Sequence, residues 1–142
     1  MKMRIVADSS ADLFTSADNS IVSVPLKIST DVKEYVDDEN LDVKAMTDDL
    51  ASYSGRSGSA CPGTGEWLDA FGDAEWVFGV TITSHLSGSY NAARVAKEQY
   101  EEEKRKVEEQ LKKAQNSNNN ENGINEQQNK IQDTKELDKQ GQ

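Results

Sequence analysis

Residues 75–100, EWVFGVTITSHLSGSYNAARVAKEQY, decide the class of fold that this sequence predicts. The first part, 75–83, is a nearly continuous apolar run, which is the pattern of a strand buried on both faces. Small hydroxyl residues and Gly88 then interrupt the run, and 87–100 has apolar residues at helical spacing. A buried strand that turns directly into a helix is the building unit of a parallel α/β sheet.

The rest of the first 100 residues supplies further elements of such a fold. Expected elements are a strand at 3–7, a helix start at 10–14 with Ser9 or Ser10 as its N-cap, a strand at 21–26 that Pro25 confines to an edge or an end, a helix at 40–53 beginning at Asn40 or Asp42, a loop at 54–65 and a short helix at 66–71. The predicted fold class is therefore α/β, a small parallel sheet flanked by helices. Three strands are few for a complete domain, so we expect a partial one.

The composition of the chain changes after Tyr100. All aromatic residues lie within residues 1–100, and this segment is expected to be the folded domain. Residues 101–115 are highly charged and predict a helical extension through Glu-to-Lys pairs. Residues 116–142 are rich in Asn and Gln and predict a disordered tail.

Charge and composition exclude several classes of function. The chain has a formal net charge of −10, which argues against nucleic acid and against an anionic membrane surface as partners. No apolar run reaches the roughly 20 residues of a membrane span, and no signal peptide is evident, so we expect a cytoplasmic protein. The single cysteine, Cys61, excludes an internal disulfide and is expected to be a small buried residue. The acidic run 31–42 lacks the spacing of a calcium loop, so neither a metal nor a cofactor is expected.

Three segments follow strand ends and precede helix starts, where parallel sheets bind ligands. They are 8–10, 57–65 and 84–89, and each offers small hydroxyls and free backbone amides. This chemistry suits an anionic head group, with Ser87 as an O–H donor and Gly88 allowing close approach to the backbone. Alternatively, Ser87 is only a helix cap and Gly88 only eases the turn. A serine hydrolase using His85 and Ser87 is a third hypothesis, which the absence of a G-x-S-x-G elbow disfavours.

Five motifs in order, RIVADSSADL, VPLKIS, KEYVDDENLD, SACPGTGEWLDAFG and VTITSHLSGSYNAARVAKEQY, together resemble the N-terminal part of the DegV family. The resemblance implies a bacterial, non-enzymatic protein that binds a long-chain fatty acid. In several members the protein presents the acyl carboxylate to a separate fatty-acid kinase, so a kinase subunit is an implied partner. Family members continue through a second domain, which is replaced here by charged and Asn/Gln-rich sequence, so a truncated member is expected.

The resemblance also implies ligand residues. The family's Thr-Ser-x-Pro loop corresponds here to residues 59–62, so Ser59 takes the place of the threonine hydroxyl. The family's Leu-Ser-Gly turn corresponds to residues 86–88, so Ser87 and Gly88 are the second half of the carboxylate site, with Ser10 and Ser89 as further candidates. An interaction or scaffold protein acting through its helical tail, or a non-functional fragment, are the alternatives to fatty-acid binding.

Overall fold

The structure, a computed structural model, describes residues 2–139 of the chain and the side chains of residues 2–116. Its strands are β1 (Met3–Asp8), β2 (Ile21–Val24), β3 (Lys27–Ser29), β4 (Glu34–Val36), β5 (Gly58–Ala60) and β6 (Trp76–Val80). Its helices are the 3-10 turn η1 (Ser9–Ala11), α1 (Val43–Ser52), α2 (Thr64–Phe71) and α3 (Ser89–Lys139). The chain divides into two compact units, of which the first ends at Tyr100 and the second begins at Glu101.

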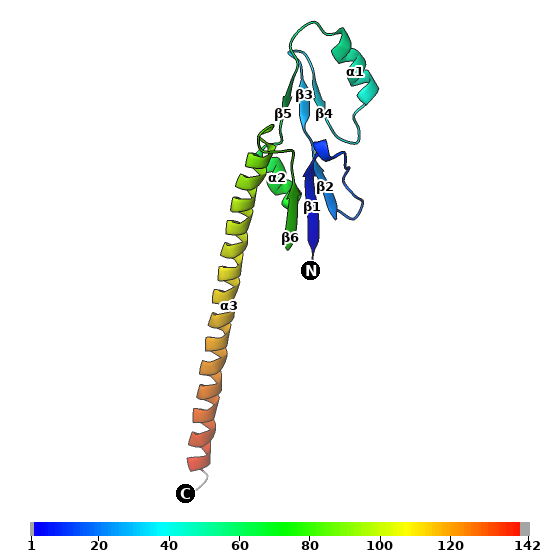
Figure 1. The fold of residues 1–142 in the computed structure, drawn as a ribbon. Coiled ribbons are helices and arrows are strands. Elements are labelled where there is room, and N and C mark those ends of the chain that lie inside the picture. The colour runs from blue at the N-terminus through cyan, green and yellow to red at the C-terminus, as the bar shows by residue number, and fades with distance from the viewer. Residues whose placement is uncertain (1, 140–142) are drawn as a thin grey trace. The chain divides into compact units, whose positions relative to one another are not determined.

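A parallel sheet of the three predicted strands forms the centre of the first unit. Its order is β2-β1-β6, so β1 lies between the two others (Figure 1). Ile5 is opposite Ile21 of β2 and Phe78 of β6, and all pairs are parallel. The predicted α/β class with a small parallel sheet is therefore confirmed.

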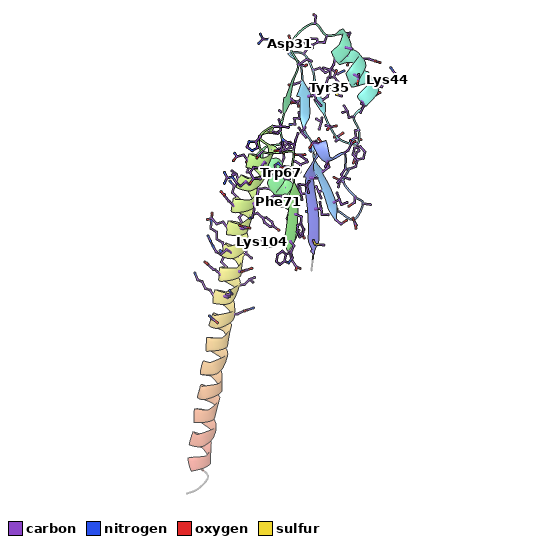
Figure 2. All side chains as sticks on the ribbon, viewed as in Figure 1. Asp31, Tyr35, Lys44, Trp67, Phe71 and Lys104 are labelled. Carbon is purple, nitrogen blue, oxygen red and sulfur yellow. The ribbon has the colours of Figure 1, made fainter. Side chains whose placement is uncertain are left out.

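One face of this sheet carries the hydrophobic core, because α2 and the first turns of α3 both cover it. Trp67 and Phe71 of α2 lie against the sheet (Figure 2), with their ring centroids 6.1 Å apart. Phe71 in turn meets Tyr100 edge-on at 5.6 Å. The buried cluster comprises Val6, Val24, Trp67, Phe71, Ala93 and Ala96. Ala93 and Ala96 are the buried residues that α3 contributes to this cluster.

The opposite face of the parallel sheet is bare within the part of the chain that the structure describes. Trp76 and Phe78 of β6 are 60% and 55% exposed, and beside them Met3 and Ile5 of β1 are exposed too. The prediction that 75–83 is buried on both faces was therefore wrong, since β6 is an edge strand with one uncovered side. An apolar run of this kind is compatible with burial on both faces, but in the structure helices cover only one face of β6.

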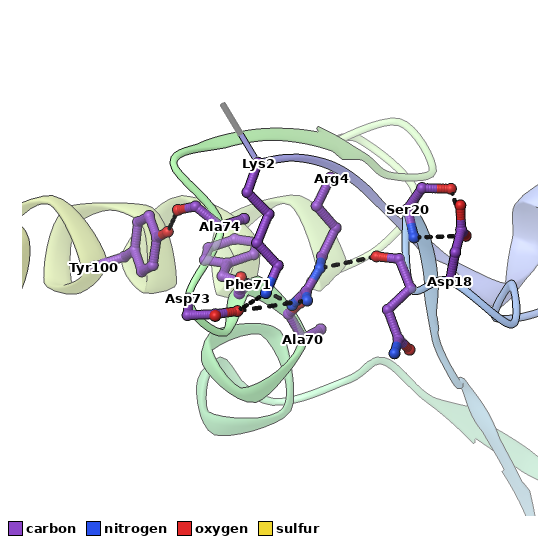
Figure 3. A network of polar contacts seen from close by, with 10 residues as sticks. Lys2, Arg4, Asp18, Ser20, Ala70, Phe71, Asp73, Ala74 and Tyr100 are labelled. Carbon is purple, nitrogen blue, oxygen red and sulfur yellow. Dashed lines mark hydrogen bonds and ion pairs between the residues drawn. The ribbon is translucent and has the colours of Figure 1, made fainter.

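Arg4 crosses from the sheet to the end of α2 (Figure 3). Its guanidinium donates to the carbonyls of Ala70 at 2.9 Å and Phe71 at 3.1 Å, and its Nε donates to the Asn19 carbonyl at 3.1 Å. A cation here satisfies the last carbonyls of a helix, which have no partner inside it. The buried Arg4 therefore fixes the C-terminal end of α2 against β1.

A second sheet, antiparallel and of order β4-β3-β5, lies beyond the carboxyl end of β1 (Figure 1). Its buried Tyr35 donates a hydrogen bond of 2.7 Å to Asp49 of α1, and Lys33 pairs with the same carboxylate at 2.5 Å. Asp42 accepts from the Ala45 amide at 2.9 Å, so it is the N-cap of α1, as one of the two predicted residues. The sequence did not predict this sheet, because its strands are only three residues long.

Two predicted segments differ in the structure. The helix expected at 10–14 is only the turn η1, because Asp12 has a positive φ of 57° and ends it. The tail expected to be disordered from residue 116 continues α3 as far as Lys139, while residues 140–142 lie outside the described residues. Extending an existing helix costs much less free energy than starting a new one, because each added residue gains a hydrogen bond. Residues 116–139 also contain no proline, which would end the helix.

Candidate functional site

The two segments expected to hold a ligand lie against each other. β5 is followed by residues 61–63, which lead into α2, and β6 is followed by residues 81–88, which lead into α3. A Cβ placed on Gly88 would lie only 3.0 Å from the Cys61 Sγ. Ser59 stands two residues before this contact and Ser87 directly beside it, so segments 28 residues apart in the chain meet at one place.

The same place has two helix beginnings. α2 starts at Thr64 and α3 at Ser89, each within three residues of the Cys61–Gly88 contact. The first amide groups of a helix have no partner inside it, and the helix dipole adds partial positive charge there. A chain with a net charge of −10 therefore presents a locally favourable position for an anion.

The turn before α3 is held by its own hydrogen bonds. The Leu86 amide donates to the Thr83 carbonyl at 3.0 Å, and the Ser89 amide donates to the Ser87 Oγ at 3.2 Å. Ser87 thus acts as a helix cap through its oxygen. Among the side chains that the structure describes, its own proton has no acceptor, so the same hydroxyl can donate to a ligand.

Ser59 lies on an edge strand of the antiparallel sheet. It is exposed and stands opposite Ile28 of β3. Within residues 2–116, no side-chain hydrogen bond is made by its hydroxyl, which leaves this group available as well. The geometry therefore offers one hydroxyl from each segment.

A buried carboxylate, Asp8, lies behind the turn. Asp8 is 0% exposed, and its Oδ2 accepts from the Ile82 amide at 3.0 Å and from the Ser89 Oγ at 2.7 Å. Its Oδ1 accepts from the Ser10 Oγ. The hydroxyl protons of Ser10 and Ser89 are therefore used within the protein, and these two serines support the site from behind.

The neighbouring Ser9 connects this region to the second sheet. Its Oγ accepts from the Leu26 amide at 3.0 Å, one residue before β3 begins. β3 in turn pairs with β5, the strand that carries Ser59, so this bond links the end of β1 to that strand through β3. Residues 8–10 thus contact the turn that carries Ser87 directly, and they reach the Ser59 strand only through β3.

Two residues were not singled out correctly from the sequence. Cys61 was expected to be buried, but its thiol is exposed, because Pro62 takes the fully buried position next to it. Asp8 was seen only as part of a polar segment, although an acid at the end of a buried strand signals a partner. His85 is exposed and makes no hydrogen bond to Ser87 in the described part of the chain.

The described residues form neither a metal site nor a membrane-spanning helix. No group of three or more His, Cys, Asp or Glu side chains there is arranged to hold a metal ion. Likewise, none of the helices in that part of the chain is both long and apolar enough to cross a membrane.

Known proteins similar in sequence share one family name. A family model described as an uncharacterised protein of the DegV family matches residues 2–137. A DegV domain-containing protein of Streptococcus pneumoniae is 43% identical over 107 residues, covering 72% of this chain and 38% of the relative. One from Streptococcus gordonii is 38% identical over 111 residues, covering 75% and 40%. The chain thus spans about 40% of the length of these curated relatives.

Solved structures agree with the sequence matches. A DegV family protein from Eubacterium eligens, loaded with heptadecanoic acid, has a TM-score of 0.68 at 48% identity, covering 71% of this chain and 37% of that one. The fatty acid kinase B3 protein of Streptococcus pneumoniae, loaded with linoleic acid, has a TM-score of 0.67 at 39% identity, covering 72% and 38%.

Proposed function

Because this chain belongs to the DegV family, we propose that it binds the carboxylate of a long-chain fatty acid through Ser59, Ser87 and the backbone beside Gly88. The observation that carries this proposal is the contact between Cys61 and Gly88, which brings one candidate hydroxyl segment against the other. Two solved relatives hold heptadecanoic acid and linoleic acid, and each of these acids has the carboxylate that such a site would bind.

The polar part of the site fits a carboxylate better than a neutral group. Two hydroxyl donors and two helix beginnings all favour negative charge. Hydrogen bonds to a charged acceptor contribute about 1.5–3 kcal/mol each. The acyl chain contributes about 0.8 kcal/mol for each methylene that it buries, so most of the affinity for a long acid comes from apolar surface.

Exposed apolar side chains that can contact the acyl chain lie next to the turn at Ser87 and Gly88. Leu86 is 76% exposed and Tyr90 is half exposed, and both flank the Ser87–Gly88 segment. On β6, which precedes this turn, Val80 and Phe78 are exposed apolar side chains as well. We propose that the first methylenes of the acyl chain pack on these side chains.

The role that we propose for the bound acid is presentation to a fatty-acid kinase, without catalysis by this chain. This proposal is supported by the similar streptococcal protein, which is named as the B3 protein of a fatty acid kinase. A kinase needs the carboxylate within reach, and Ser59 and the Gly88 backbone are exposed at the surface of the first unit.

Titration of the full chain with palmitate or oleate tests the binding. Ser87→Ala and Ser59→Ala are each expected to weaken binding about 10- to 150-fold, because each removes one charge-assisted hydrogen bond. Ser52→Ala is the matched control, since Ser52 lies exposed on α1 and donates only to the Asp49 carbonyl. Absence of saturable binding, or equal affinity in the Ser87→Ala and Ser52→Ala variants, contradicts the proposal.

A further inference from the structure

We infer that Asp8 is the positioning residue of the carboxylate site, an inference that rests on the proposed function. It does not touch the ligand, because it is 0% exposed and both of its oxygens already accept hydrogen bonds. Its role is to set where the turn carrying Ser87 and Gly88 lies relative to the end of β1.

One oxygen atom holds both ends of that turn. The Ile82 amide donates to Asp8 Oδ2 at the point where the chain leaves β6, and the Ser89 hydroxyl donates to the same atom where α3 begins. The residues between them, 83–88, are thus closed into a loop whose two ends meet at a single atom. Ser87 and Gly88 lie inside this loop, so their position depends on Asp8.

A carboxylate is suited to holding this turn because of its capacity to accept hydrogen bonds. It accepts several hydrogen bonds and donates none, and here it takes three from neutral donors in three separate segments. Among the described residues, no ion pair is formed by Asp8. A buried carboxylate without a cation is costly, and it persists where a polar network specifies one arrangement.

Asparagine preserves most of this arrangement and alanine does not. The amide oxygen of Asn can accept from both Ile82 and Ser89, while its NH₂ group can donate to the Ser10 oxygen. Asp8→Ala leaves the Ile82 amide and the Ser89 hydroxyl buried without an acceptor. Asp8→Asn is therefore the conservative variant expected to rescue the geometry. Ser52→Ala is the control, since Ser52 lies exposed on α1 and donates only to the Asp49 carbonyl.

Two readouts on the full chain test the inference. The first needs no ligand: Cys61 is the only cysteine and lies against Gly88, so its rate of alkylation by iodoacetamide reports the position of the turn. The second is the dissociation constant for oleate. In Asp8→Ala we expect faster alkylation and about tenfold weaker binding. Asp8→Asn and Ser52→Ala are expected to resemble the original chain in both readouts.

The outcomes separate this inference from the proposed function. If the original chain does not bind oleate, the proposed function fails. The alkylation rates, which need no ligand, then still test whether Asp8 positions the turn. Unchanged alkylation in a folded Asp8→Ala variant overturns the positioning role, as does Asp8→Asn behaving like Asp8→Ala. If Asp8→Ala does not give cooperative unfolding, Ser89→Ala replaces it. Faster alkylation in Ser89→Ala than in Ser52→Ala then supports the inference, while equal rates overturn it.

Discussion

Replacing Gly88 by alanine tests whether the Ser59 segment and the Ser87 turn are in contact. A Cβ at position 88 would lie 3.0 Å from the Cys61 Sγ, closer than carbon and sulfur normally pack. Among the glycines of the described residues, only Gly72 has a positive φ, so alanine at position 88 meets no backbone strain. The expected effect therefore comes from displacing the Cys61 segment.

The magnitude follows from two contributions. The exposed Cys61 side chain must give way to the added methyl, which costs about 0.5–1.5 kcal/mol if it leaves a staggered rotamer. Glycine is also preferred to alanine just before a helix begins, which adds about 0.5–1 kcal/mol. We expect the free energy of unfolding of Gly88→Ala to fall by about 1–2.5 kcal/mol. Binding of oleate should weaken about tenfold, because Ser59 moves with Cys61.

A double-mutant cycle measured by urea unfolding and by oleate titration isolates the contact. Cys61→Ala removes the sulfur at an exposed position and should cost little alone. In that background Gly88→Ala should cost only the helix-start contribution, so the coupling energy is about 0.5–1.5 kcal/mol. Gly65→Ala is the control, since a Cβ there meets nothing within 4 Å and alanine should stabilise α2.

The reasoning is refuted if Gly88→Ala is equally destabilising with and without the sulfur. A coupling energy below about 0.3 kcal/mol means that the two mutations act independently. The segments carrying Ser59 and Ser87 would then not be in contact in solution, and a shared carboxylate site would lose its main support.

Three further predictions concern the frame around the site. Arg4→Met removes the donors to three carbonyls and should lower the free energy of unfolding by about 2–4 kcal/mol in urea titrations, whereas no change would show that the end of α2 needs no cation. Hydrogen bonds from Ser16 and Ser20, of which Figure 3 shows those from Ser20, lower the pKa of Asp18 to about 2, so its stabilisation is complete above pH 3.8 and is lost as pH falls through about 2. The difference in melting temperature between the original chain and Asp18→Ala should shrink over that range, and a constant difference contradicts the assignment. Phe78→Lys changes an exposed side chain on the bare sheet face and should alter the free energy of unfolding by less than about 0.5 kcal/mol in urea titrations, whereas a large loss would show that this face is covered.

Local sequence predicted the parallel sheet and most of its helices. Apolar runs at 3–7, 21–26 and 75–83 became β1, β2 and β6, and Asp42 capped α1. These features depend on residues close together in the chain. The antiparallel sheet was missed because its strands are short and its pairing joins Ile28 to Ser59, far apart in sequence.

Exposure was the property that sequence predicted least well. The apolar run of β6 reads as doubly buried, yet whether a second layer covers it depends on elements elsewhere in the fold. Cys61 reads as a small buried residue, but the neighbouring Pro62 occupies the interior position instead. Burial is a property of the assembled layers, and a local pattern shows only that it is possible.

The sequence by itself determined which chemical groups are present at the strand ends: hydroxyls at Ser59 and Ser87, and a glycine at 88 that admits close approach. It also determined that each segment precedes a helix, because small and polar residues end the apolar runs there. Only the tertiary structure decided that the two segments meet at Cys61 and Gly88, and that Ser10 and Ser89 donate inward to Asp8. The contact between Cys61 and Gly88 joins residues 27 positions apart, and that between Asp8 and Ser89 joins residues 81 positions apart. Their geometry exists only once the sheet has aligned the strand ends.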